Sequence, residues 1–175
     1  WLSDRDIWQV VKQHEKQDPS FAFLFPVPID FHSVKSALNE VHLGNLLAGG
    51  KKHLASVLNT DVDSGPGEHW FTVYIDMRTP GTILLENFNS TGDGIHPNVA
   101  KFFHKIARTA PAGTDVQIIV NSKAHQRGDT ECGVYAIDYI VWRMKGRSMA
   151  QYNSRYRYDL DMKAKRPYYF RRVRK

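Results

Sequence analysis

The chain has one cysteine, Cys132, and the residues around it favour nucleophilic chemistry. A polar, turn-prone run over 126–131 gives way at Cys132 to apolar residues at helical spacing, which predicts a helix that begins at the cysteine. Unpaired backbone N–H groups and the positive end of the helix dipole favour thiolate over thiol there, so we expect a lowered thiol pKa. Gly133 removes a side chain where a substrate carbonyl would have to approach. We therefore predict a nucleophilic cysteine, against the common alternative of a buried apolar one.

A thiol nucleophile needs a general base, and His69 is the best placed of the eight histidines. It opens a predicted strand directly after the turn at 63–67, where a side chain can project over a cleft. A second strand over 82–88 is predicted to return antiparallel, so that its end comes back beside His69. Glu86 and Asn89 lie there, and either could accept the imidazole N–H and hold its tautomer. Alternation places them on opposite faces of the strand, and spacing leaves the choice open.

Gln126 is a candidate donor to the oxyanion that forms when a thiol attacks a carbonyl group. It precedes Cys132 across a short loop that can fold its amide back toward the start of the helix. The amide N–H of Gln126 and the backbone N–H of Cys132 could then face the same oxygen. Nucleophile, base, orienting group and oxyanion donors are the parts of a cysteine hydrolase.

The elements that must position these residues follow an α+β order. Periodicity predicts helices over 3–16, 33–47, 98–108 and from Cys132, strands over 53–58, 69–77, 82–88 and 116–120, and an edge strand or loop over 21–27. A chain of 175 residues with 42% hydrophobic content is long enough for one domain with a substantial core. We therefore expect a single domain over 1–175.

The net charge of +6 is concentrated near the C-terminus, and without residues 155–175 the chain is close to neutral. Basic residues in this segment alternate with tyrosines, so it could contact nucleic acid or a virion core. The more common alternative is a solvated helix whose aromatic residues pack back on the domain, and this is the one we expect.

The remaining composition limits compartment and cofactors. A single cysteine excludes an internal disulfide and a multi-cysteine zinc site, which favours a reducing, intracellular compartment. No apolar run reaches membrane-spanning length, so we expect no membrane contact. The sequence lacks complete zincin and P-loop motifs, and we expect a monomer without metal or other cofactor. Because the chain begins at Trp1 instead of a methionine, we expect further residues upstream.

Together these motifs resemble a known group of enzymes. His-Trp, then Asn or Asp followed by Ser, then Gln-x₅-Cys-Gly is the motif order of the adenovirus-endopeptidase and SUMO-protease group of cysteine proteases. A closer similarity is to the polyprotein-processing protease of African swine fever virus and related large DNA viruses. It is carried between about Leu58 and Tyr139 by VLNTD (57–61), GEHW (67–70), YIDMR (74–78), ENFNS (86–90) and HQRGDTECG (125–133).

The resemblance implies a papain-like α+β fold, with a central mixed or antiparallel sheet and the nucleophile at a helix N-terminus. It also implies a role for each matching residue: Cys132 as nucleophile, His69 as general base, Gln126 in the oxyanion hole and Asn89 as the residue that orients the imidazole. Asn89 stands where aspartate is commoner, so the imidazole would lack a full counter-charge. Glu86 stays the alternative, because the adenovirus enzyme has a glutamate at the matching distance from its histidine.

The opening WLSD (1–4) resembles the WLND segment of SUMO proteases, whose tryptophan helps to wall a narrow channel for a Gly-Gly terminus. Trp1 and Trp70 are therefore candidates for substrate binding, since closely spaced indole walls admit only residues without a Cβ. The resemblance implies an endopeptidase that cleaves viral structural polyproteins after Gly-Gly motifs during virion maturation, in virions and host cytoplasm. Two alternatives stay open: a SUMO- or ubiquitin-like deconjugating protease, and an inert nucleic-acid-binding module.

Overall fold

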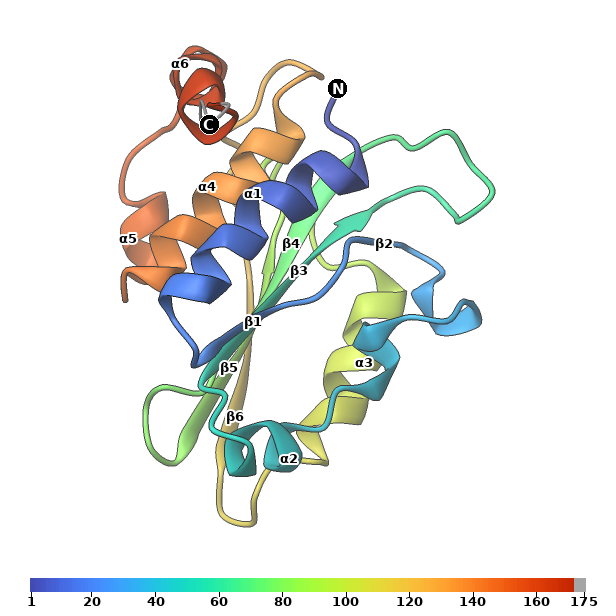
Figure 1. The fold of residues 1–175 in the computed structure, drawn as a ribbon, viewed down its shortest axis with the longest axis vertical. Helices are drawn as coiled ribbons and strands as arrows, with labels where there is room; N and C mark the ends of the chain where they lie inside the picture. The colour runs from blue at the N-terminus through green and yellow to red at the C-terminus, as the bar shows by residue number, and fades with distance from the viewer. Residues whose placement is uncertain (172–175) are drawn as a thin grey trace.

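A mixed β-sheet runs through the centre of the molecule in the computed structural model, which describes residues 1–171 (Figure 1). The strand order is β1-β3-β4-β5-β6, and β2 also pairs with β3. Neighbours among β3, β4 and β5 are antiparallel, whereas β1, β2 and β6 join in parallel. The strands are β1 (Phe21–Phe23), β2 (Val27–Pro28), β3 (His53–Asn59), β4 (Trp70–Asp76), β5 (Thr82–Phe88) and β6 (Asp115–Val120).

Helices cover both faces of the sheet (Figure 1). One face carries α1 (Asp4–Gln17), α4 (Cys132–Met144), α5 (Met149–Asn153) and α6 (Asp159–Tyr169); the other carries α2 (Leu43–Ala48), α3 (Pro97–Ala107) and two 3₁₀ turns, Phe31–Ser33 and Ala37–Glu40. Alternation along β4 sends Trp70 and Tyr74 into the core under α1 and α4, and Phe71 and Val73 into the core under α3. None of the helices in the described chain combines the length and apolar character needed to cross a bilayer.

The predicted fold class is confirmed: a mixed sheet is flanked by helices, and α4 begins at Cys132. The predicted strands over 53–58, 69–77 and 82–88 correspond to β3, β4 and β5. Ser3 caps α1, because its side chain accepts the N–H of Asp6 while the Asp6 carboxylate accepts the N–H of Ser3. These elements carry strong local signals, and the structure forms them where the periodicity places them.

The helix predicted over 33–47 is wrong, because polar side chains in this segment bond to the backbone and interrupt it. The Ser36 side chain accepts the N–H of Leu38, and the Asn39 amide donates to the carbonyl groups of Phe31 and Val34. His42 then caps the short helix α2 by accepting the N–H of Asn45. Such local bonds offer the backbone an alternative to a continuous helix.

The basic C-terminal segment packs on α4 as far as the described residues go, and 172–175 lie outside them. Met162 of α6 is fully buried in the same core as the apolar residues of α4. Lys165 Nζ lies 2.6 Å from Asp138 Oδ1, and Arg166 pairs with Glu131 at 3.1 Å. Part of the positive charge is therefore used inside the fold, and contact of this segment with nucleic acid stays a prediction.

Candidate active site

Cys132 is the first residue of α4, and its thiol lies against the start of β4. The residue is 3% exposed, and the backbone N–H groups of Trp70, Gly133 and Cys132 itself lie near enough to the thiol to favour its charged form. Glu131, at the N-cap, makes no side-chain capping bond, so its carboxylate does not occupy the first N–H groups of the helix. Because Trp70 directly follows His69, the contact brings the sulfur to the strand end that carries the histidine.

The lowered pKa expected for the Cys132 thiol is wrong. Burial raises this pKa, and the N–H groups of Trp70 and Gly133 offset only part of the effect. The dipole of α4 favours the thiolate, whereas the segments packed around the first turn of the helix desolvate the sulfur and favour the neutral thiol. A thiol in this setting depends on a neighbouring base to take its proton.

The imidazole of His69 is held by Asn89, which immediately follows β5. His69 Nε2 lies 2.7 Å from Asn89 Oδ1, and the same oxygen accepts the backbone N–H of Thr91 at 3.1 Å and its hydroxyl at 2.8 Å. A backbone N–H can only donate, so Thr91 identifies this atom as the amide oxygen. Nε2 must then carry the hydrogen, which leaves Nδ1 of a neutral His69 as the proton acceptor.

Gln126 is held by Ser90, the residue after Asn89. Ser90 Oγ donates to Gln126 Oε1 at 2.7 Å, and Gln126 Nε2 donates one hydrogen to the Gly128 carbonyl at 2.7 Å. The backbone N–H of Gln126 also donates to the Ser90 carbonyl, at 2.9 Å. The amide is therefore fixed in orientation, and its second hydrogen remains available to another acceptor.

The loops that carry Asn89 and Gln126 touch at Gly92. This glycine has φ +77°, and a Cβ there would lie 2.7 Å from Ala124 N and 2.9 Å from Lys123 C. Both obstacles are backbone atoms, which cannot move aside as a flexible side chain can. Only glycine lets the two loops approach this closely.

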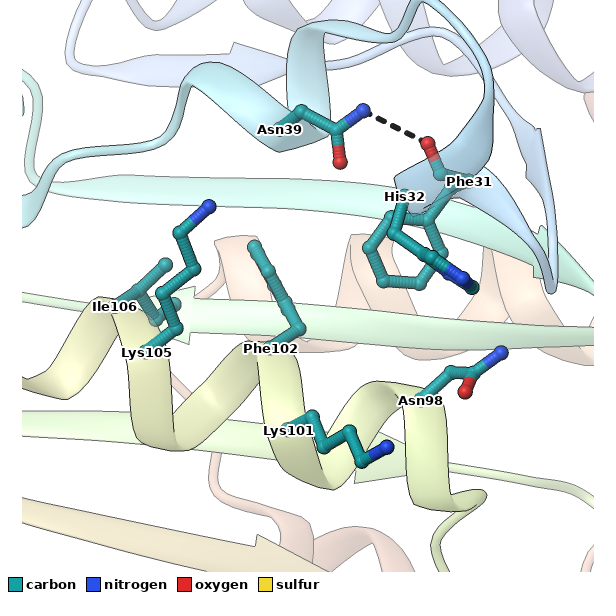
Figure 2. A pocket seen from close by; sticks show the side chains of 8 residues that line it. All are labelled: Phe31, His32, Asn39, Asn98, Lys101, Phe102, Lys105 and Ile106. Carbon is teal, nitrogen blue, oxygen red and sulfur yellow. Dashed lines mark hydrogen bonds between the residues drawn. The ribbon is translucent and has the colours of Figure 1, made fainter.

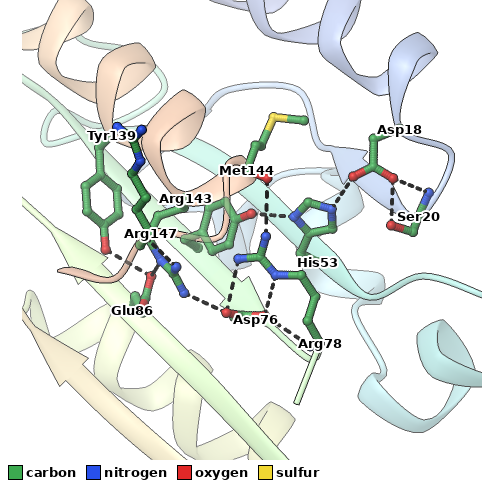
Figure 3. A network of polar contacts seen from close by, with 11 residues as sticks. Asp18, Ser20, His53, Asp76, Arg78, Glu86, Tyr139, Arg143, Met144 and Arg147 are labelled. Carbon is green, nitrogen blue, oxygen red and sulfur yellow. Dashed lines mark hydrogen bonds and ion pairs between the residues drawn. The ribbon is translucent and has the colours of Figure 1, made fainter. Parts of the chain in front are cut away.

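Glu86, the alternative partner of the histidine, lies elsewhere in the interior (Figure 3). It is 1% exposed and accepts hydrogen bonds from Arg143 Nε at 2.8 Å and Tyr139 OH at 2.9 Å. Arg143 also bonds to Asp76, at 2.7 Å. Burial raises the pKa of Glu86, against the opposing effect of the Arg143 guanidinium. The His69 imidazole is thus bonded to Asn89, while Glu86 joins β5 to α4.

A groove of about 450 Å³ adjoins the start of β4, and both predicted tryptophans line it. Trp1 is 65% exposed, whereas Trp70 is buried and its indole N–H donates to the Leu2 carbonyl at 3.0 Å. The space expected beside Gly133 is filled, because a Cβ there would meet the Leu2 side chain at 2.9 Å. The missing side chain of Gly133 serves the packing of the N-terminal segment, and its expected role in substrate approach has no support in this geometry.

A second cavity, of about 470 Å³, adjoins the candidate base. His69, Asn89, Phe71 and Asn87 contribute to its wall. Asn87 is 1% exposed, and among the described residues its Oδ1 has no hydrogen-bond partner. Asn87, which lines the same cavity as His69, thus has an unused acceptor.

The residues that hold the others in place were not predicted from the sequence. Asn59, at the end of β3, accepts the N–H groups of Asp61 and Glu68 at 2.9 and 3.0 Å, and so closes the loop that leads into His69. Ser90 and Thr91 fix the two amides described above. Asn59 lies in the VLNTD stretch and Ser90 in the ENFNS stretch. The order of residues in these stretches does not indicate which group either side chain bonds to.

Comparison with known proteins identifies relatives among viral proteases, although no protein-family model matches the chain. The chain is 30% identical over 158 residues to a cysteine protease of African swine fever virus, and 28% identical over 148 residues to a protein of Acanthamoeba polyphaga mimivirus provisionally named a thiol protease. These alignments cover 82% and 83% of this chain, but 58% and 48% of the relatives. The chain thus spans about half the length of the curated relatives it matches.

Solved structures with a similar fold include one of these relatives and a SUMO protease. The crystal structure of the African swine fever virus protease matches 97% of this chain and 67% of its own, with a TM-score of 0.88 at 23% identity. The C-terminal Ulp1 protease domain, solved in complex with the yeast ortholog of SUMO, matches 85% of this chain and 68% of its own, with a TM-score of 0.54 at 15% identity. The chain is therefore related to viral cysteine proteases and has the papain-like fold of the African swine fever virus protease and of the SUMO protease Ulp1.

Proposed function

We propose that the chain is the catalytic part of a cysteine endopeptidase, with Cys132, His69, Asn89 and Gln126 as its machinery. The hydrogen bond between His69 and Asn89, made beside the strand residue whose N–H faces the thiol, is the observation that carries the proposal. It leaves Nδ1 of the imidazole as the base. The names of the viral relatives support the same chemistry.

The reaction follows from the positions of these groups. Nδ1 of His69 takes the thiol proton as Sγ of Cys132 forms a bond to the scissile carbonyl carbon. The oxygen becomes negatively charged and accepts the N–H of Cys132 and the second amide hydrogen of Gln126. The C–N bond then breaks as the imidazolium protonates the leaving amine. Water, deprotonated by the same imidazole, hydrolyses the thioester and regenerates the thiol.

The substrate we propose is a polypeptide with a Gly-Gly motif before the scissile bond. The groove lined by Trp1 and Trp70 is the candidate channel, since flat aromatic walls favour residues without a Cβ. Viral structural polyproteins, cleaved during virion maturation in a reducing intracellular compartment, are the substrates that the resemblance favours.

The test is cleavage of a fluorogenic peptide with Gly-Gly before the scissile bond, compared with the same peptide carrying Ala-Ala. We expect turnover of the Gly-Gly peptide alone and none by Cys132→Ala or His69→Ala. Equal turnover of both peptides would contradict the proposed glycine specificity. If the wild type and Cys132→Ala were equally inactive toward both peptides and toward polyprotein, the proposed protease activity would be contradicted.

A second candidate is removal of SUMO- or ubiquitin-like proteins from conjugates. Proteins of two African swine fever virus isolates, 34% identical over 117 residues, carry the name SUMO-1 cysteine protease; the alignment covers 66% of this chain and 42% of theirs. Probes made of SUMO or ubiquitin with an electrophile at the C-terminal glycine separate the candidates. Rapid labelling of Cys132 by one probe, with slow cleavage of polyprotein, favours the deconjugase.

A further inference from the structure

A cavity of about 220 Å³ lies between α3 and the 3₁₀ turns, on the face of the sheet opposite α4 (Figure 2). Its floor is apolar: Phe31, Phe102 and Ile106 are exposed by 2%, 6% and 2%. These side chains belong to the core under α3, whereas Cys132 belongs to the core under α4. The cavity is therefore separate from the candidate active site.

Two amide side chains in its wall present oxygen atoms to a ligand. The NH₂ group of Asn39 donates to the carbonyl groups of Phe31 and Val34 at 2.8 and 2.9 Å, and that of Asn98 donates to the Ile29 carbonyl at 3.1 Å. These bonds to the backbone fix both amides. Each Oδ1 remains an acceptor, so a matching ligand supplies N–H or O–H donors.

The rim of the cavity is positively charged. Lys101 and Lys105 lie one turn apart on α3, and His32 lies across from them (Figure 2). No acidic residue occurs in α3, and within residues 1–171 neither lysine forms an ion pair. The ligand that complements this rim is an anion.

We infer that this cavity is a docking site for an acidic peptide segment that carries one large apolar side chain. The apolar side chain fills the floor, peptide N–H groups donate to Asn39 and Asn98, and flanking carboxylates pair with Lys101 and Lys105. The inference rests on the proposed function, because such a segment of a polypeptide substrate would be held here while another segment occupies the active site.

A nucleotide also combines negative charge with hydrogen-bond donors, but the aromatic geometry favours a peptide. Phe31 and Phe102 meet edge to face, with ring centroids 5.5 Å apart and an interplanar angle of 83°. A base stacks between or upon parallel flat faces, and this pair provides no parallel walls. An aliphatic or aromatic side chain requires no such platform.

Binding is measured first, on the Cys132→Ala chain, so that the result is independent of cleavage. The probe is a fluorescein-labelled peptide in which two aspartates flank a phenylalanine on each side. Its binding is measured by fluorescence anisotropy. We expect saturable binding that is lost when alanine replaces the phenylalanine. K101E/K105E should weaken it about tenfold, the effect of reversing two partly exposed charge pairs.

The matched control is K16E/K163E, which makes the same charge change at two exposed lysines on α1 and α6. We expect it to bind the probe within about twofold of the unmodified chain, since screened charges on other faces contribute little. Equal weakening by both double variants would show a general charge effect and overturn the docking site. Unchanged binding by K101E/K105E, or equal binding of the alanine peptide, would overturn it as well.

Two further measurements assign the occupant. Stronger binding of an oligothymidylate than of the acidic peptide, lost in K101E/K105E, would give the cavity to nucleic acid and overturn the inference. With active protein, K101E/K105E should cleave a short Gly-Gly peptide at the wild-type rate. It should cleave a polypeptide that also carries the acidic, apolar segment with a kcat/KM reduced by about the same factor as binding. Equal loss on both substrates would contradict a separate docking site.

Discussion

Ser90 and Gln126, 36 residues apart in the sequence, are joined by a 2.7 Å hydrogen bond between Oγ and Oε1. The residue before Ser90 is Asn89, which accepts the imidazole N–H of His69. Two adjacent residues after β5 therefore orient both the candidate base and the candidate oxyanion donor. A disturbance at this strand end is therefore expected to affect both proton transfer and charge stabilisation.

Gln126→Ala is expected to lower kcat by about 10²–10³, the usual cost of one oxyanion donor. Ser90→Ala leaves the donor in place but no longer fixes its orientation, and we expect a loss of about tenfold, equivalent to about 1.4 kcal/mol and within the range for one hydrogen bond. Because Ser90 acts through Gln126, the double variant should be no slower than Gln126→Ala. Additive losses would show that Ser90 acts independently, and Ser122→Ala, at an exposed serine, is the control.

Asn89→Leu removes the acceptor of the imidazole N–H, and we expect kcat to fall by on the order of 10²-fold or more, given a cost of about 10⁴ for a misoriented histidine in a related triad. Asn89→Asp keeps an acceptor and adds a charge that stabilises the imidazolium. The acid limb of kcat/KM should therefore move to higher pH. A pH–rate profile for each variant measures this, and an unshifted profile in Asn89→Asp would contradict contact between the two side chains.

Glu86→Gln is expected to lower stability while leaving the chemistry intact. The neutral amide leaves Arg143 poorly compensated in the interior, at a cost of about 3 kcal/mol in the free energy of unfolding. Denaturant unfolding measures this loss, and Glu68→Gln, at an exposed position, should be neutral. If Glu86→Gln instead abolished turnover and kept the stability of the wild type, Glu86 would be the third member of the triad.

Acidification is expected to destabilise the fold through its buried histidines. His53 lies 2.8 Å from Asp18 and also bonds to Tyr74, and burial lowers its pKa (Figure 3). The same cause lowers the pKa of His125. A lowered pKa means that the folded chain binds the proton less tightly than the unfolded chain does. Stability is therefore fully present above the ordinary histidine pKa of about 6.5, and it falls as the pH drops toward the folded-state pKa.

Thermal melting between about pH 8 and pH 5 tests this expectation. We expect Tm to fall on the acid side, and the slope to be smaller in His53→Gln, which keeps hydrogen-bonding atoms but does not titrate. His32→Gln, at an exposed histidine, should keep the wild-type slope. An equal slope in His53→Gln and the wild type would exclude His53 as a source of the effect.

The sequence predicted the parts of the fold whose signals are local. Cys132 begins α4 because a polar run changes to an apolar helical pattern at that residue, and β4 and β5 follow from two apolar runs around a Pro-Gly turn. The helix predicted over 33–47 does not form as one element, because Asn39 and His42 make side-chain bonds to the backbone that the apolar spacing does not reveal. Periodicity describes which residues face the core, but not which polar side chains interrupt the helix.

The parts that could not be predicted depend on distant partners. The choice between Asn89 and Glu86 is decided by Arg143, which arrives from α4 and occupies the glutamate. The direction of the thiol pKa is decided by burial, which depends on how other segments pack over the start of α4. Neither relationship leaves a trace in the spacing of residues along the chain.

The backbone contact at Gly92 gives this region an unusual intolerance. A methyl group added there would collide with Lys123 and Ala124, and the collision could be relieved only by parting the two segments that bear Asn89 and Gln126. A saturation library at position 92 should therefore yield almost no active clones, although the residue takes no part in bond making. Loss of activity at this position would therefore report the close spacing of two segments. From the library alone, it would look like evidence for a catalytic residue.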